Sequence, residues 1–232
     1  MFALKTYAVS LFRLLFPKLC VVCGRPLVWG EKTLCLNCLC AMPRTHYQHQ
    51  VDHPVEQLFW GKLPIERAMA WCHFVKGGTL QTLLHALKYH RRPDVGVVLG
   101  RQMALECAAW LQPIDVIVPI ALHCRRLQKR GYNQAECIAQ GIASVLDIPI
   151  CCGVLMRSVE TATQTKLRVF ERYENTQGVF SVTNGHELAH KHVLLVDDVI
   201  TTGATLLAAA QTLYKEIPTC KISIATLAVA SA

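Results

Sequence analysis

Short, largely apolar runs recur along the chain and alternate with segments whose apolar residues are three or four positions apart. Asp115–Ile120, Val193–Val196 and Ile222–Val229 have the pattern of strands buried on both faces of a parallel sheet. Helical spacing is seen in Leu80, Leu83, Leu84 and Leu87. The alternation predicts an α/β fold built on a doubly wound, mainly parallel sheet.

The same patterning predicts the remaining elements and two units. We expect helices at Pro93–Leu111 and Tyr132–Leu146, a helix-favouring run at Leu206–Leu213, and a short strand at Pro149–Leu155. The polar segment Thr45–His53, which contains His46, His49 and His53, is interpreted as a solvated linker. A small N-terminal module of residues 1–50 therefore precedes a larger domain of residues 51–232.

Composition indicates a folded protein with a basic surface. Of the 232 residues, 52% are hydrophobic and 17% are charged, which is unlike a disordered chain. A net charge of +8 favours polyanionic partners such as nucleic acid, although charge alone does not identify one. Residues 1–16 are apolar but contain Lys5 and Arg13, and they are too short to span a bilayer. They fit an amphipathic helix packed on its own domain or, alternatively, one that contacts a membrane surface.

Four of the twelve cysteines have a metal-binding spacing: Cys20-x2-Cys23-x11-Cys35-x2-Cys38. Two Cys-x2-Cys pairs at this separation can surround one Zn²⁺ ion tetrahedrally. Four thiolates leave no open position for a water, so the metal would be structural and would contribute about 10 kcal/mol to folding the module. Cys40 lies close enough to compete as a ligand. Reduced thiols of this kind indicate a cytoplasmic protein.

An acidic pair, Asp197 and Asp198, follows the strand predicted at Val193–Val196. A turn rich in hydroxyl groups comes next, at Thr201, Thr202, Gly203, Ala204 and Thr205. Backbone N–H groups of such a turn, at a helix N-terminus, bind phosphate, and glycine allows close approach. Ionised carboxylates accept hydrogen bonds from sugar hydroxyls. Together these residues predict a site for a phosphorylated pentose.

A basic segment is expected on the loop after the strand predicted at Asp115–Ile120, and therefore at the same edge of the sheet. It carries Arg125, Arg126, Lys129 and Arg130. Arg126 and Arg130 are the candidates to contact pyrophosphate or DNA phosphates. The basic cluster Lys88–Arg92, at the end of a predicted helix, is either a solvated helix end or a further phosphate contact.

The stretch His192–Thr205 resembles the phosphoribosyl-pyrophosphate (PRPP) motif of type I phosphoribosyltransferases. R-G-Y-N-Q at residues 130–134, L-K-Y at 87–89 and the N-terminal cysteine module are similar to the ComF family of competence proteins. A further similarity lies in the spaced polar pattern of residues 157–180. Two departures are Ala121, where the family often has proline, and the absence of a second pair of cysteine knuckles.

The resemblance implies a type I phosphoribosyltransferase fold with an N-terminal zinc module. It implies PRPP with Mg²⁺ in the site, Asp197 and Asp198 as its catalytic residues, and a hood loop over the site. The hood residues would be Arg157, Thr161, Gln164, Arg172 and Asn175. The position of the base in purine-salvage relatives holds Thr201, so binding is a safer expectation than turnover.

Three functions remain open from the sequence. The first is a competence protein for DNA uptake in natural transformation, working with single-stranded DNA, a helicase and other uptake proteins. The second is an active phosphoribosyltransferase for nucleotide or nucleobase salvage, and the third is a PRPP-sensing regulator without turnover. The resemblance places the protein in the cytoplasm, at the inner membrane if residues 1–16 contact it.

Overall fold

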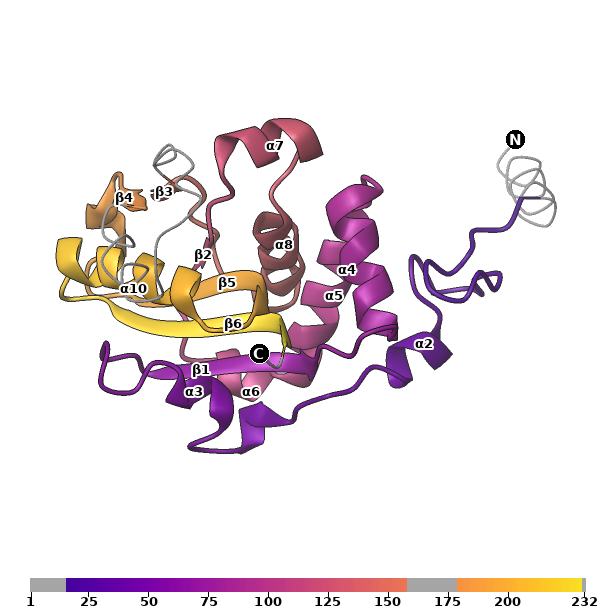
Figure 1. The fold of residues 1–232 in the computed structure, drawn as a ribbon, viewed down its shortest axis with the longest axis horizontal. Coiled ribbons are helices and arrows are strands. Elements are labelled where there is room, and N and C mark those ends of the chain that lie inside the picture. Colours follow the sequence, from indigo (N-terminus) through magenta and orange to yellow (C-terminus); the bar gives the residue numbers. More distant parts are fainter. Residues whose placement is uncertain (1–15, 158–178, 231–232) are drawn as a thin grey trace, which may run out of the picture.

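The computed structural model describes residues 16–157 and 179–230, and within them a four-stranded parallel sheet forms the centre (Figure 1). The strand order is β1-β6-β5-β2. The strands are β1 (Arg67–His73), β2 (Val116–Pro119), β5 (His192–Ile200) and β6 (Lys221–Val229). Val193, Leu194, Leu195 and Val196 are all buried. Because consecutive strand residues point to opposite faces, both faces of the sheet are covered, which confirms the predicted α/β class.

Helices connect the strands and cover the sheet. The longer ones are α4 (Thr79–Tyr89), α5 (Pro93–Glu106), α8 (Gln134–Leu146) and α10 (Ala204–Glu216). Shorter elements are α2 (Leu36–Cys40), η1 (Tyr47–His49), α3 (Pro54–Gln57), α6 (Ala108–Leu111), α7 (Cys124–Arg130) and η2 (Gly185–Leu188). Strands β3 (Leu155–Arg157) and β4 (Phe180–Val182) form a separate antiparallel pair.

Helices α5 and α8 cross with their backbones in contact. A Cβ atom at Gly100 would overlap the carbonyl oxygen of Ile138, and one at Gly141 would overlap that of Val97. Glycine is therefore required at both positions by space, and the two helices pack as one rigid unit.

Thr45, Tyr47 and His53 attach residues 45–53 to the larger domain, whereas His46, His49 and residues 50–52 are exposed, so the expected solvated linker is correct only in part. The Thr45 N–H donates to the carbonyl oxygen of Trp71 at 3.0 Å, and the Thr45 hydroxyl donates to that of Ala70 at 2.5 Å. His53 is 3% exposed, and its ring stacks on Tyr47 with centroids 4.3 Å apart. The sequence pattern did not indicate β1, which precedes the first strand we expected. The division into two units at residue 50 stays a prediction.

Three other expectations differ from the structure in detail. Helix α5 ends at Glu106, and α6 begins after Cys107, where one helix was expected. Of the expected strand at residues 149–155, Ile150 forms an isolated bridge with Ile117 and Leu155 opens β3. Strand β5 continues to Ile200, so the acidic pair lies within the strand rather than after it.

Candidate functional site

The acidic pair occupies the C-terminal part of β5, next to the turn that leads into α10. Asp197 lies opposite Thr226 of β6 in the parallel register. Both aspartates are partly buried, and the Asp198 N–H donates to Asp197 Oδ1 at 2.8 Å. The two carboxylates are therefore held at the edge of the sheet where ligands bind in α/β folds.

The turn after β5 presents its hydroxyl residues to solvent. Thr201, Thr202 and Thr205 are exposed, whereas Gly203 is buried in a left-handed conformation with φ +75° at the N-terminus of α10. A Cβ at Gly203 would lie 3.4 Å from Phe59 Cζ. The turn thus rests on the segment between α3 and β1. Its first N–H groups point out of a 13-residue helix, the arrangement that binds phosphate.

Two cations balance the acidic pair. Lys88, near the end of α4, places Nζ 2.7 Å from Asp198 Oδ2. Burial, with the charge of Asp198, raises the pKa of Asp197 to about 7, and the charges of Lys88 and Arg157 oppose that rise. Lys88 comes from the L-K-Y segment, to which the sequence assigned no role at the acidic pair.

Arg157 of β3 is close enough to Asp197, and to Arg126 of α7, for their charges to act on it. Burial lowers the pKa of Arg157, the positive charge of Arg126 lowers it further, and the negative charge of Asp197 raises it. Of the expected hood residues, the structure brings Arg157 into this group. The others, Thr161, Gln164, Arg172 and Asn175, lie outside the described residues.

A basic cavity of about 480 Å³ lies beside Lys88. It is lined by Lys88, Tyr89, Arg91, Arg126, Lys129, Arg130 and Tyr132. The guanidinium carbon of Arg130 lies 5.7 Å from the centre of the Tyr89 ring. The cavity brings Arg126 and Arg130 together, and it also includes Lys88 and Tyr89 from the end of α4 and Arg91 from the α4–α5 connection.

The R-G-Y-N-Q segment joins α7 to α8, and most of its residues have structural roles. Gly131 ends α7 with φ +81°. The Asn133 Oδ1 accepts from the Ala135 N–H at 3.1 Å and so caps α8, while its Nδ2 donates to the Ile120 carbonyl at 2.9 Å. The basic segment expected to be a loop is therefore the helix α7, fixed between β2 and α8 by its flanking caps.

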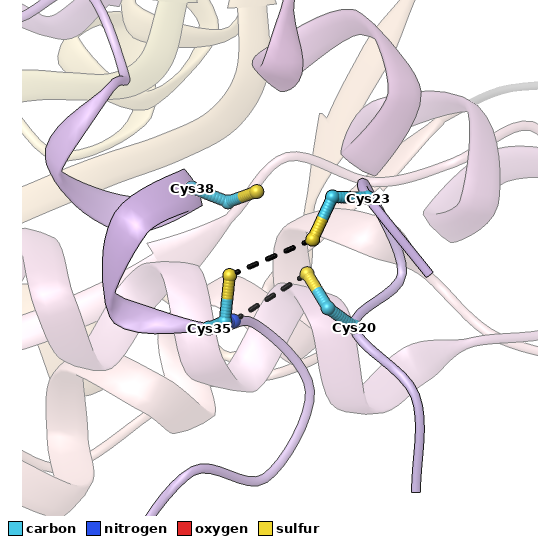
Figure 2. Close-up of side chains that lie close together, drawn as sticks. All are labelled: Cys20, Cys23, Cys35 and Cys38. Carbon is cyan, nitrogen blue, oxygen red and sulfur yellow. Dashed lines mark hydrogen bonds between the residues drawn. The ribbon is translucent and has the colours of Figure 1, made fainter. Parts of the chain in front are cut away.

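The four cysteines of the N-terminal module come together, as Figure 2 shows. Their sulfur atoms all lie within 4.8 Å of one another, and the Cys23 and Cys35 sulfurs are 3.7 Å apart. Tetrahedral Zn²⁺ with Zn–S bonds of about 2.3 Å requires sulfur separations of about 3.8 Å, so this donor set fits the metal. Burial acts to raise the pKa of Cys20, but hydrogen bonds from backbone N–H groups outweigh it and lower that pKa to about 6. Cys40 is outside this cluster.

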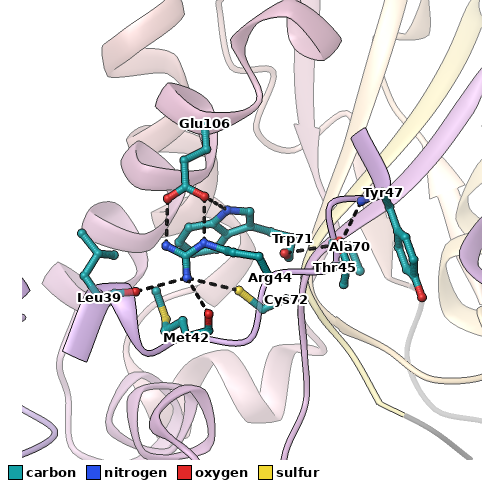
Figure 3. A network of polar contacts seen from close by, with 9 residues as sticks. All are labelled: Leu39, Met42, Arg44, Thr45, Tyr47, Ala70, Trp71, Cys72 and Glu106. Atoms are coloured by element: carbon teal, nitrogen blue, oxygen red, sulfur yellow. Dashed lines mark hydrogen bonds and ion pairs between the residues drawn. The ribbon is translucent and has the colours of Figure 1, made fainter. Parts of the chain in front are cut away.

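Two contacts fix the cysteine module to α5. The Thr33 hydroxyl donates to Asp94 Oδ2 at 2.9 Å. Arg44 donates from Nε and Nη2 to the two oxygens of Glu106, at 2.7 and 2.8 Å, and its guanidinium lies 4.2 Å from the centre of the Trp71 ring (Figure 3). Another Arg44 nitrogen donates to the Leu39 carbonyl at the end of α2. Arg44 thus joins the module to both β1 and α5.

The parallel sheet covered by helices, together with a family match, gives the class as a phosphoribosyltransferase-like domain. The family model described as phosphoribosyl transferase domain matches residues 132–232. The chain belongs to the ComF family of competence proteins. It is 30% identical over 219 residues to the DNA utilization protein YhgH of Escherichia coli K12, covering 86% of this chain and 92% of that protein.

A second relative agrees with this placement. Competence protein F of Haemophilus influenzae is 31% identical over 84% of this chain and 78% of its own length. Glutamine PRPP amidotransferase of B. subtilis is 22% identical with a TM-score of 0.41, over 60% of this chain and 30% of that one. An adenine phosphoribosyltransferase of Saccharomyces cerevisiae is 16% identical with a TM-score of 0.33, over 65% of this chain and 68% of that one. These TM-scores are low, so the placement rests on the family model and on the two relatives.

No helix in residues 16–157 and 179–230 is both long and apolar enough to cross a membrane.

Proposed function

We propose that this protein acts in the uptake or use of DNA, as the names of its relatives state for them, and that it binds PRPP with Mg²⁺ at the end of β5. The observation that supports this ligand is the order of groups along the chain at the end of β5. The Asp198 N–H donates to Asp197 Oδ1, and the acidic pair is followed by an exposed, hydroxyl-rich turn at the N-terminus of α10. The carboxylates suit the hydroxyl groups of a pentose, and the turn suits its phosphate.

Each part of the ligand has a partner of suitable chemistry. The 5′-phosphate would lie on the turn from Thr201 to Thr205, held by backbone N–H groups and hydroxyls. The ribose hydroxyls would donate to Asp197 and Asp198, and carboxylates of this kind also suit Mg²⁺. Arg126 and Arg130 would contact the pyrophosphate or DNA phosphates. Thr201 cannot act as a base at neutral pH, so we propose binding rather than transfer.

The basic cavity supports a nucleic acid as the second ligand. Among its seven lining residues, five carry positive charge and two are tyrosines, Tyr89 and Tyr132. Cations that follow the backbone together with aromatic rings that stack on unpaired bases are typical of single-stranded DNA sites. The charge of the whole chain, +8, has the same sign.

Other parts of the proposal rest on the family resemblance. The four clustered cysteines would hold a structural Zn²⁺ ion. A helicase and further uptake proteins as partners, a hood formed by residues 157–175, and membrane contact through residues 1–16 all stay predictions.

Thermal stability with Mg²⁺-PRPP tests the pentose site. The wild-type protein should gain several degrees in Tm at saturating ligand, because binding stabilises the folded state by mass action. The double variant Asp197→Asn, Asp198→Asn should remain folded and lose the gain. Glu216→Gln removes an exposed acid at the far end of α10, and this variant should keep the ligand-induced gain in Tm. An equal gain in the double variant would exclude the acidic pair from the site.

The DNA site is tested by the salt dependence of binding to a fluorescent oligothymidylate. Each phosphate contact to single-stranded DNA contributes about −0.7 to the slope of log K against log salt. Removing Arg126 or Arg130 by substitution with Gln should therefore weaken binding and reduce the slope by roughly that amount. Arg101→Gln, at an exposed position of α5, is the control. Slopes that do not respond to the first two variants would place the DNA elsewhere.

A further inference from the structure

Lys88 belongs to two sites at once. Its Nζ lies 2.7 Å from Asp198 Oδ2, and its side chain is 25% exposed. It also lines the basic cavity, together with Arg126 and Arg130. Five cations line that cavity. Within the part of the chain that the structure describes, Lys88 is the one among them that forms an ion pair with the acidic pair.

The charges around the acidic pair explain why Lys88 is held there. Asp197 and Asp198 are adjacent and partly buried, so their mutual repulsion is poorly screened. Arg157 faces Asp197, but Arg126 repels Arg157 in turn. Lys88 therefore supplies the direct counter-charge to Asp198 in the free protein. A sugar diol accompanied by a divalent cation would compete with Lys88 for the same oxygens.

We propose that Lys88 couples the two sites: a phosphorylated pentose with Mg²⁺ at the acidic pair displaces the Lys88 ammonium into the basic cavity, where it strengthens binding of a nucleic-acid phosphate backbone. This inference rests on the proposed function for both ligands. It adds a link between them that neither site alone requires. Because binding free energies are reciprocal, DNA in the cavity must strengthen pentose binding by the same factor.

Whether the pentose strengthens or weakens DNA binding depends on which pentose is used. Ribose 5-phosphate occupies the acidic pair and the turn but carries no pyrophosphate, so it leaves the cavity open. PRPP would place its pyrophosphate near Arg126 and Arg130 and compete with DNA. Ribose 5-phosphate is therefore the probe that isolates the coupling.

The experiment measures the Kd of the full chain for a fluorescent oligothymidylate, at constant Mg²⁺ and salt, with and without saturating ribose 5-phosphate. Binding of ribose 5-phosphate itself is measured separately by its effect on Tm. In the wild type, the pentose should tighten DNA binding by about five- to tenfold, the lower range of measured couplings. In Lys88→Met, the ratio of the two Kd values should fall to about one.

Lys129→Met is the matched control. Lys129 is exposed and lines the same cavity, so its loss also removes one positive charge there. It should weaken DNA binding in both conditions and keep the wild-type ratio. A ratio of one in the wild type, with both ligands shown to bind, overturns the coupling and leaves the proposed function intact. The same ratio in Lys88→Met as in the wild type overturns the role of Lys88. Failure of ribose 5-phosphate alone to bind the wild type overturns the inference, whereas failure of DNA, or of PRPP in the thermal test, contradicts the proposed function as well.

Discussion

The cysteine module and the parallel sheet are stabilised by different forces. Strands β5 and β6 are buried along most of their length between helices, and their stability comes from apolar area removed from water. In the module, by contrast, Val28, Trp29 and Leu36 are exposed, and Trp29 is 96% exposed. Cys20 and Cys35 are among its few buried residues. We expect a unit with so little core to depend on a metal ion bound by the four cysteines, whereas the sheet should not.

Loss of the metal should give the largest difference between the two regions. We expect Cys35→Ser, or a strong chelator, to unfold residues 16–42 while the sheet stays folded, since bound Zn²⁺ contributes on the order of 10 kcal/mol to such modules. Hydrogen exchange resolved by peptide measures it. Cys40→Ser, outside the cluster, should leave exchange unchanged. Simultaneous exchange of β5 and β6 would show that the two regions are one cooperative unit.

The pH dependence of the sheet should come from Asp197. Its pKa is raised to about 7 in the folded state, so the protonated form is favoured there. This contribution to stability is complete below the unfolded pKa near 4 and is lost as the pH rises through about 7, by a few kcal/mol in total. Pentose binding should show the opposite trend and strengthen over the same range, because the ligand requires the carboxylate.

Denaturant unfolding from pH 4 to 8 in wild type and Asp197→Asn measures this contribution. The variant should lose most of the decline in stability toward neutral pH. A decline of the same size in both proteins would assign it to groups other than Asp197. The buried histidines His53 and His192 are not among them, because burial lowers their pKa and their contribution to stability therefore increases with pH.

The joint between the two regions should depend on Arg44. Arg44→Ala removes both donors to Glu106 and the cation above Trp71, and we expect a loss of about 1–3 kcal/mol in unfolding free energy. Arg44→Lys keeps the charge but cannot donate to both oxygens, so it should recover part of the loss. Chemical denaturation measures both. Arg101→Ala, exposed on α5, should change stability little; an equal effect there would remove the special role of Arg44.

The smallest effect should follow Gly203→Ala in the turn. The left-handed backbone should cost about 1–2 kcal/mol with a side chain present, and the new methyl group would touch Phe59. Gly153→Ala has a similar φ of +81° with nothing within 4 Å. Both variants should lose similar stability, but only Gly203→Ala should weaken the PRPP-induced rise in Tm. Equal ligand responses would mean that the turn does not contact the phosphate.

The parts of the site that are contiguous in sequence could be predicted, and those that depend on packing could not. Asp197 to Thr205 form one strand, turn and helix, so their chemistry is visible in order along the chain. Lys88 reaches Asp198 only because α4 lies beside the end of β5, and no local pattern indicates that contact. The cavity around Tyr89 and Tyr132 has the same origin.

The fold class followed from the apolar runs, while its first strand did not. Strand β1 reads R-A-M-A-W-C-H, which contains helix-favouring alanine and methionine and lacks β-branched residues. It becomes a strand through its pairing with β6. Likewise, Thr45 and His53 belong to a polar segment, and their burial results from contacts with β1 that composition does not indicate.

The contact between α5 and α8 through Gly100 and Gly141 has a mechanical consequence. Helix α5 holds the cysteine module at both of its ends, through Asp94 and Glu106, and α8 begins at the wall of the basic cavity. At Gly100 and Gly141 the backbones of the two helices are in contact, so we expect sliding of one helix along the other to be resisted there. The two helices connect the end of the molecule that carries the four cysteines to the surface on which we place the DNA, so we expect a displacement at one end to be passed to the other.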